Sequence, residues 1–322
     1  MRFVLRYCVI AYFLLSMMIM AAIVQEFFPW HDASADMPVK PAREVSAENT
    51  PSDKEKAEPE KKSGLAAVDT AAIDKILGTP KEGFSIYYMR PDGEDEPYIY
   101  NDKGRSPASM IKLFVMAAVM DEVHAGNMTL DEQILIDKKN VVGGAGKLSR
   151  FDAGKKYSVE KLLALMIEDS DNTATNVFID KLGIDNINSY MAKNGYDGTK
   201  LYNKMMQRLS KESNVTTAKD VGALLTKIYK GECVGKDEDA KMLELLGKQH
   251  DTECFPKALP DYKIAHKVGE ADGSYNAGGI FEGAKGNFVL VVLSKDTAGR
   301  NDAVKKIQEV AKYGADMAKK QK

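Results

Sequence analysis

Ser109 and Lys112 stand one helical turn apart in a segment whose apolar residues predict a buried helix. We expect that helix to span residues 107–124, because Pro107 suits a helix start and nearly every face of the segment is apolar. A serine hydroxyl becomes a nucleophile when a neighbouring base removes its proton, and a buried lysine with a lowered pKa is such a base. The pair therefore predicts nucleophilic chemistry, although this short pattern also arises by chance.

Ser170 and Asn172 supply a second hydroxyl and an amide. They follow the apolar helical run of residues 161–167 and begin a helix expected over residues 172–182, which Gly183 would end. In an extended segment their side chains point the same way, so Ser170 would pass a proton to a leaving amine while Asn172 holds a substrate amide. Ser, Asp and Asn are also preferred helix N-caps, and the two roles are compatible.

Lys267 and Gly269 lie on one face of the strand that the alternating residues 262–269 predict. The glycine would let a ligand lie along the strand edge, and the lysine would bind a substrate carboxylate. An ordinary surface lysine on an edge strand would give the same pattern.

Together, these three motifs resemble those of the penicillin-recognising serine hydrolases, specifically the class A β-lactamase-like family, whose signature set is S-x-x-K, S-D-N and K-T-G. The flanking sequence is similar too: S-D-N-T-A-T-N runs from Ser170 to Asn176, and A-H-K-V-G fills residues 265–269. The resemblance covers residues 66–322. It implies an α+β fold of the β-lactamase/transpeptidase type, with an antiparallel sheet from both chain ends, flanking helices, an all-helical subdomain and the site at their seam.

The resemblance also implies catalytic roles. Ser109 would be the nucleophile and Lys112 its base. Ser170 and Lys267 would relay a proton to the leaving nitrogen. No metal or other cofactor is implied.

The implied substrate-binding residues are Asn172, Lys267, Gly269 and Glu270. Asn172 would orient the substrate amide, and the backbone N–H groups of Ser109 and Glu270 would form the oxyanion hole. A glutamate at position 270 is unusual beside a carboxylate-binding site, and the sequence offers no reason for it.

Two departures from the family pattern change the expected chemistry. Val268 replaces the usual Thr or Ser and loses a bond to the substrate carboxylate worth ~1.5–3 kcal/mol. The family's deacylating glutamate, in an E-x-x-L-N motif, has no counterpart in residues 199–209, which contain no carboxylate. Glu212 follows, off the motif and just before the next expected helix. We therefore expect acylation with slow deacylation.

Three functions compete. The first is an extracytoplasmic serine hydrolase acylated at Ser109 by β-lactams or D-alanyl peptides, with weak turnover. The second is a penicillin-binding D,D-peptidase, which the missing glutamate favours. The third is a non-catalytic, membrane-anchored cell-wall sensor or scaffold, which the presence of both Ser109 and Lys112 disfavours.

Composition excludes other classes. The net charge of −2 over 322 residues does not indicate a nucleic-acid partner. The four histidines are scattered and show no H-x-H or H-E-x-x-H spacing, which argues against a zinc hydrolase.

The N-terminal part has a different composition. Residues 8–24 form an uncharged apolar run after Arg2 and Arg6, so we expect residues 1–25 to be a signal-anchor in the cell membrane, with the catalytic domain extracytoplasmic. A signal peptide cleaved near residues 33–35, giving a secreted protein, is the alternative. Residues 26–65 are rich in Pro, Glu, Lys and Ser and predict a disordered linker.

The two cysteines of the folded part, Cys233 and Cys254, flank a helix expected over residues 237–247. Outside the membrane such a pair predicts a disulfide worth ~3 kcal/mol, with two free buried thiols as the alternative. We expect a monomer.

The remaining elements follow from periodicity. We expect strands near both ends of the folded part and helices between them, which predicts one sheet built from the two ends and a helical insert. The expected strands are residues 84–89, 98–101, 262–269, 277–281 and 287–294, and the expected outer helices are residues 66–77 and 301–319.

Overall fold

The computed structural model describes residues 68–79, 81–93, 96–271 and 273–319. The chain divides into the units Met1–Glu60 and Lys61–Lys322, and every described residue belongs to the second unit. The membrane segment and the linker expected at residues 8–24 and 26–65 lie outside the described residues. Within the described part, no helix has the length and apolar character that a membrane crossing requires.

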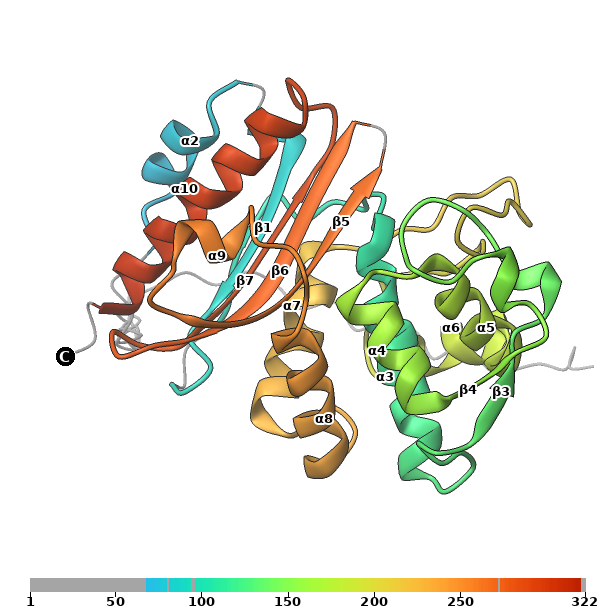
Figure 1. Cartoon of the computed structure of the whole chain (residues 1–322). Coiled ribbons are helices and arrows are strands. Elements are labelled where there is room, and N and C mark those ends of the chain that lie inside the picture. The colour runs from blue at the N-terminus through green and yellow to red at the C-terminus, as the bar shows by residue number, and fades with distance from the viewer. Residues whose placement is uncertain (1–67, 80, 94–95, 272, 320–322) are drawn as a thin grey trace, which may run out of the picture. The chain divides into compact units, whose positions relative to one another are not determined.

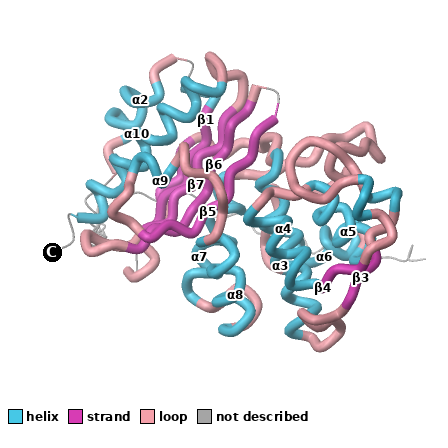
Figure 2. Tube along the Cα trace, viewed as in Figure 1, coloured by secondary structure: helices cyan, strands magenta, loops and turns pink. Residues whose placement is uncertain are grey.

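An antiparallel sheet of five strands lies beside the helical part of this unit (Figure 2). The strands lie in the order β2 (Tyr98–Tyr100), β1 (Phe84–Met89), β7 (Phe288–Ser294), β6 (Ser274–Glu282) and β5 (Lys263–Ala271). Every residue of β1 and β7 is buried, because helices cover both faces of the sheet. Strand β5 is an edge strand, and it carries the predicted Lys267 and Gly269.

One face of the sheet packs against α2 (Thr70–Leu77), α9 (Phe255–Ala258) and α10 (Arg300–Ala318) (Figure 1). The helices bury apolar side chains against alternate strand residues, as the period of two in a strand requires. This core includes Ile73, Ile86, Tyr88, Leu290, Val292 and Ile307.

The opposite face packs against α7 (Ala218–Lys230), beside which lies α8 (Lys236–Gly247). A Cβ atom at Gly222 would lie 2.1 Å from the Tyr87 ring, so the glycine lets α7 approach the sheet closely.

The helical part surrounds α3 (Ile111–His124), whose residues 111–120 are all buried, as the apolar pattern predicts. Around it lie α4 (Val159–Glu168), α5 (Asn172–Leu182) and α6 (Ile184–Lys193). The remaining elements are the hairpin of β3 (Gln133–Leu135) and β4 (Lys156–Ser158), and the 3-10 turns η1 (Lys81–Gly83), η2 (Ala108–Met110), η3 (Lys138–Asn140) and η4 (Arg150–Asp152).

The predicted architecture is confirmed: strands from both chain ends form one sheet, and helices occupy the middle of the sequence. The helix expected from residue 107 begins instead as the turn η2, before α3 starts at Ile111.

The predicted disulfide is wrong. Cys233 and Cys254 are free, buried thiols. Cys233 belongs to the core between α7 and the helical part, where its sulfur lies 3.7 Å from the Tyr190 hydroxyl. Cys254 belongs to the core on the α10 side of the sheet, so the two thiols pack into different layers. The prediction failed because spacing along the chain does not show on which side of the sheet a thiol lies.

Candidate active site

Ser109 lies in the turn η2, directly before α3 and beside the edge strand β5. The preceding Ala108 has a positive φ of 46°, a conformation that costs a non-glycine residue energy and needs support from its surroundings. The Asn276 side chain of β6 supplies that support by donating to the carbonyl oxygens of Ser106 (2.9 Å) and Pro107 (3.3 Å). The sheet thereby holds the turn that carries Ser109 in place.

Lys112 lies on the same face of the helix start as Ser109. Its Nζ atom is 3.0 Å from Ser109 Oγ, and the side chain is fully buried. The amine also lies within hydrogen-bonding distance of the Ser170 carbonyl oxygen (2.5 Å), Ser170 Oγ (3.1 Å) and Asn172 Oδ1 (2.8 Å). The structure therefore brings the first two predicted motifs together around one amine.

The surroundings of Lys112 favour its neutral form. Burial lowers the pKa of this amine well below its ordinary value of 10.5, and the nearby Lys267 lowers it further, whereas Asp171 acts in the opposite direction. Within the described part of the chain, no carboxylate forms an ion pair with Lys112. A neutral amine 3.0 Å from a hydroxyl is positioned to accept its proton.

Ser170 and Asn172 both reach Lys112, but not through the extended backbone that we expected. Ser170 has a positive φ of 54°, and Asn172 is the first residue of α5. This left-handed backbone conformation at Ser170 directs the side chains of Ser170 and Asn172 toward the Lys112 amine. Asn172 Nδ2 also donates to the Gly143 carbonyl oxygen at 3.0 Å.

Asp171, between them, holds the loop that contains Lys147 and Leu148. Its carboxylate is the N-cap of α5, accepting from the Ala174 N–H at 2.9 Å, and it also accepts from the N–H groups of Lys147 (2.6 Å) and Leu148 (2.7 Å). A Cβ atom at Gly146 would lie 2.3 Å from this carboxylate, so only glycine fits there. The sequence indicated a cap but not the loop that it binds.

Lys267 is fully buried, so the alternative of a surface lysine is wrong. Its Nζ atom donates to Ser170 Oγ at 3.1 Å and to the Val268 carbonyl oxygen at 2.7 Å. Burial lowers the pKa of this amine to about 7, although Asp251 acts in the opposite direction. The Ser170 hydroxyl therefore bridges two lysine amines, an arrangement suited to passing a proton.

Gly269 makes room for the turn that carries Ser109. A Cβ atom there would lie 2.8 Å from the Pro107 carbonyl oxygen and 3.0 Å from the backbone nitrogen of Ser109. The glycine thus brings β5 against the backbone of Ser109. The oxyanion hole formed by the Ser109 and Glu270 N–H groups remains a prediction.

The side chain of Glu270, unexplained by the sequence, has a partner in the structure. Its Oε2 atom lies 3.1 Å from Arg300 Nε at the start of α10. Glu212 is part of the exposed loop before α7, where its carbonyl oxygen accepts from Asn203 Nδ2 at 2.5 Å.

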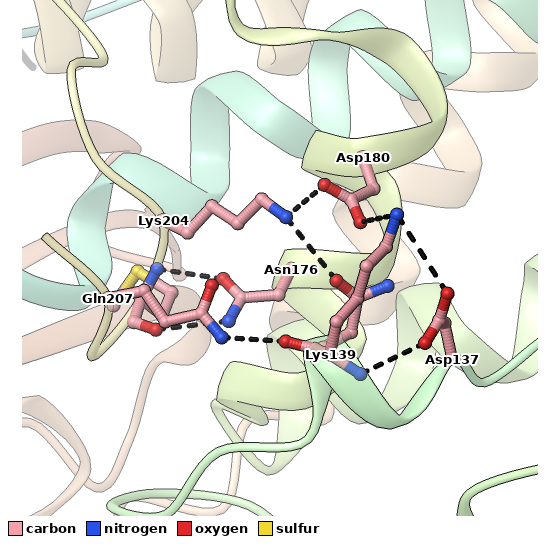
Figure 3. Close-up of polar contacts among 8 residues, drawn as sticks. Asp137, Lys139, Asn176, Asp180, Lys204 and Gln207 are labelled. Carbon is pink, nitrogen blue, oxygen red and sulfur yellow. Dashed lines mark hydrogen bonds and ion pairs between the residues drawn. The ribbon is translucent and has the colours of Figure 1, made fainter. Parts of the chain in front are cut away.

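The loop of residues 199–209 is fixed to α5 by a residue that the sequence analysis missed. Asn176, one turn after Asn172, donates to the Met205 carbonyl oxygen (3.0 Å) and accepts from the Met205 N–H (2.7 Å). Figure 3 shows Asn176 beside the ion pairs of Asp180 with Lys204 and Lys139. The second asparagine of the S-D-N-T-A-T-N motif was the available signal.

A cavity of about 340 Å³ separates this loop from the turn that carries Ser109. Pro107 and Ala108 line one side, and Met205 and Met206 line the other. No aspartate or glutamate occurs among its lining residues, all of which are described. A carboxylate that could activate water on this side of Ser109 is therefore missing from the cavity wall, as the sequence of the loop predicted.

A family model, a curated relative and solved structures all relate this chain to beta-lactamases. Residues 70–315 match the model of the beta-lactamase enzyme family. A beta-lactamase of Streptomyces lavendulae is 26% identical over 244 residues, 72% of this chain and 79% of the relative. Among solved structures, a beta-lactamase of Sphaerobacter thermophilus is similar, with a TM-score of 0.71, 24% identity, and coverage of 76% of this chain and 96% of that chain.

PBP-A is similar as well, with a TM-score of 0.70 and 24% identity over 76% of this chain and 92% of that chain. A variant of PBP-A was solved as an acyl-enzyme complex with penicillin G. At these identities the solved structures establish a shared fold.

Proposed function

The chain belongs to the beta-lactamase enzyme family, and we propose that it is an extracytoplasmic serine hydrolase that β-lactams or D-alanyl peptides acylate at Ser109. One observation carries the proposal: the buried Lys112 amine lies 3.0 Å from the Ser109 hydroxyl, with oxygens of Ser170 and Asn172 as its other partners. A base placed in this way activates a serine for attack on an amide carbonyl.

The proposed acylation uses the groups that surround this amine. Lys112 takes the proton as Ser109 Oγ attacks the amide carbon, and two backbone N–H groups hold the oxyanion. The C–N bond then breaks, and Ser170 gives its proton to the leaving nitrogen. Lys112 or Lys267, both 3.1 Å from Ser170 Oγ, resupplies that proton.

We propose that deacylation is slow. Hydrolysis of the ester at Ser109 needs a base that activates water, and such a base contributes typically about 10²–10⁴ in rate. The cavity beside the nucleophile presents Met205 and Met206 and no carboxylate. The ester at Ser109 would therefore persist.

A penicillin-binding D,D-peptidase is the second candidate. The similarity to PBP-A and the cavity wall without a carboxylate both favour it. The third candidate, a non-catalytic sensor or scaffold anchored by residues 8–24, would not require the Ser109–Lys112 contact.

A label-and-chase experiment tests the proposal. The full-length protein is treated with a fluorescent penicillin and then with excess unlabelled penicillin, and the covalent fluorescence is followed by denaturing gel. We expect label on the wild type that persists through the chase, and none on Ser109→Ala. Rapid loss of label with release of hydrolysed penicillin would indicate an efficient β-lactamase instead. Release of D-alanine from a D-alanyl-D-alanine peptide at a steady rate would favour the peptidase.

A further inference from the structure

A second cavity, of about 430 Å³, lies at the end of β5, directly after the strand residue that contacts the Ser109 backbone. Gly269 contacts the backbone of Ser109, and the next residue, Glu270, lines the cavity. Ser274, Tyr275, Thr297 and Arg300 line it as well. A donor that lies along the strand edge would extend from Ser109 into this space.

Arg300 is the cation of this cavity, and it already has two anionic partners. Its Nη2 atom lies 2.9 Å from Glu253 Oε2, and its Nε atom lies 3.1 Å from Glu270 Oε2. The guanidinium also lies over the Tyr275 ring, 5.1 Å from its centroid. Two carboxylates and one guanidinium leave this cluster with a net charge of −1.

The neighbouring strand residues do not provide a carboxylate site either. Val268 has no hydroxyl and packs against the core on the α10 side. Lys267 directs its amine to Ser170 Oγ and to the Val268 carbonyl oxygen. Burial lowers the pKa of Lys267 to about 7, so its positive charge is reduced at neutral pH.

We propose that Glu270 is a specificity residue that makes this side of the site prefer acyl donors with a neutral or cationic leaving group over donors whose leaving group carries a carboxylate. The inference rests on the proposed acylation of Ser109. An anionic leaving group meets a cluster of net charge −1 and must displace a glutamate to reach Arg300. A neutral or cationic leaving group meets neither obstacle.

Thioester donors with one acyl group and three leaving thiols test this preference. We would use N-acyl-D-alanyl thioesters of mercaptoacetate, its neutral amide mercaptoacetamide, and the cationic cysteamine. In each reaction the Ser109 Oγ–carbon bond forms, the carbon–sulfur bond breaks, and the thiol leaves with the proton that the serine lost. Because the ester at Ser109 persists, the rate of the first release of thiol, measured against donor concentration, gives the second-order acylation constant kcat/KM for each donor.

For the full-length wild type we expect kcat/KM for both the neutral and the cationic donor to exceed that of the anionic donor by about tenfold. This factor is expected because the cluster repels the carboxylate of the leaving group and salt partly screens that repulsion. In Glu270→Gln the ratio of kcat/KM for the anionic donor to kcat/KM for the neutral donor should rise, until the two values lie within about twofold of each other. Glu282→Gln is the matched control, because Glu282 pairs with Lys263 at the other end of the same hairpin. It should leave the order of the donors intact.

The outcomes are separable. An anionic donor that reacts fastest with the wild type, or a Glu270→Gln variant that changes all three donors equally, overturns the inference and leaves acylation at Ser109 standing. Failure of every donor, together with no adduct on Ser109, overturns the proposed function and the inference with it.

Discussion

The Lys112 amine lies 3.0 Å from the Ser109 hydroxyl and 2.8 Å from Asn172 Oδ1, so the proposed base contacts both the proposed nucleophile and the residue proposed to hold the substrate amide. Residues about 60 positions apart in the chain are thereby joined at a single buried nitrogen. Because burial lowers the pKa of this nitrogen, its neutral form is available to accept a proton.

The first prediction concerns the pH dependence of acylation. Protonated Lys112 cannot accept a proton, so the acylation rate should rise with pH through the pKa of Lys112, which lies well below 10.5. Lys112→Arg keeps a positive charge at every working pH and should lower the rate by about 10²–10⁴. Stopped-flow measurement of penicillin acylation at several pH values checks both results. A Lys112→Arg variant that acylates at the wild-type rate would exclude Lys112 as the base.

The second prediction concerns deacylation. Asn176 fixes both backbone polar groups of Met205, so a side chain at position 205 should stay beside the turn that carries Ser109. Met205→Glu should therefore speed loss of the penicilloyl adduct at least about tenfold, because a carboxylate can activate water there. Met205→Gln, which has the same shape without the base, is the control. Equal adduct lifetimes in the two variants would contradict this account of slow turnover.

The third prediction concerns stability. Asp171 is 1% exposed and accepts from three backbone N–H groups, so Asp171→Ala should lower the free energy of unfolding by about 2–5 kcal/mol. Asp185→Ala, at the exposed first turn of α6, should cost less than about 0.5 kcal/mol. Urea denaturation measures both values. A similar small loss in the two variants would show that the loop does not depend on Asp171.

The fourth prediction concerns the buried charge of Lys267. Its pKa is about 7 in the folded protein and 10.5 ordinarily, so between these values the unfolded chain binds more protons. The free energy of unfolding should therefore gain a contribution that rises with pH across this window and is lost as pH falls through about 7. Lys267→Met removes that contribution, so the wild type should become more stable relative to the variant as pH rises. Parallel pH profiles of the two proteins would rule out a lowered pKa at Lys267.

Much of the fold was predictable because its elements have strong local signals. Strand β1 begins and ends at the predicted residues 84 and 89, and α5 spans the predicted residues 172–182 between an Asp cap and Gly183. The apolar pattern on all sides of α3 correctly predicted its burial.

Other features of the site depend on tertiary contacts that no local pattern encodes. The positive φ of Ser170 and the full burial of Lys267 arise only when the sheet meets the helices. The pairing of Glu270 with Arg300 joins residues that are 30 positions apart in the sequence. The positions of Cys233 and Cys254 on different sides of the sheet likewise depend on tertiary contacts and not on local sequence.

The mass of the intact protein after exposure to penicillin tests the central claim most directly. We predict one penicilloyl adduct per chain, located by peptide mapping on Ser109, that persists while little hydrolysed penicillin accumulates. Unmodified protein at every time point, or an adduct on another residue, would contradict the assignment of Ser109 as the nucleophile.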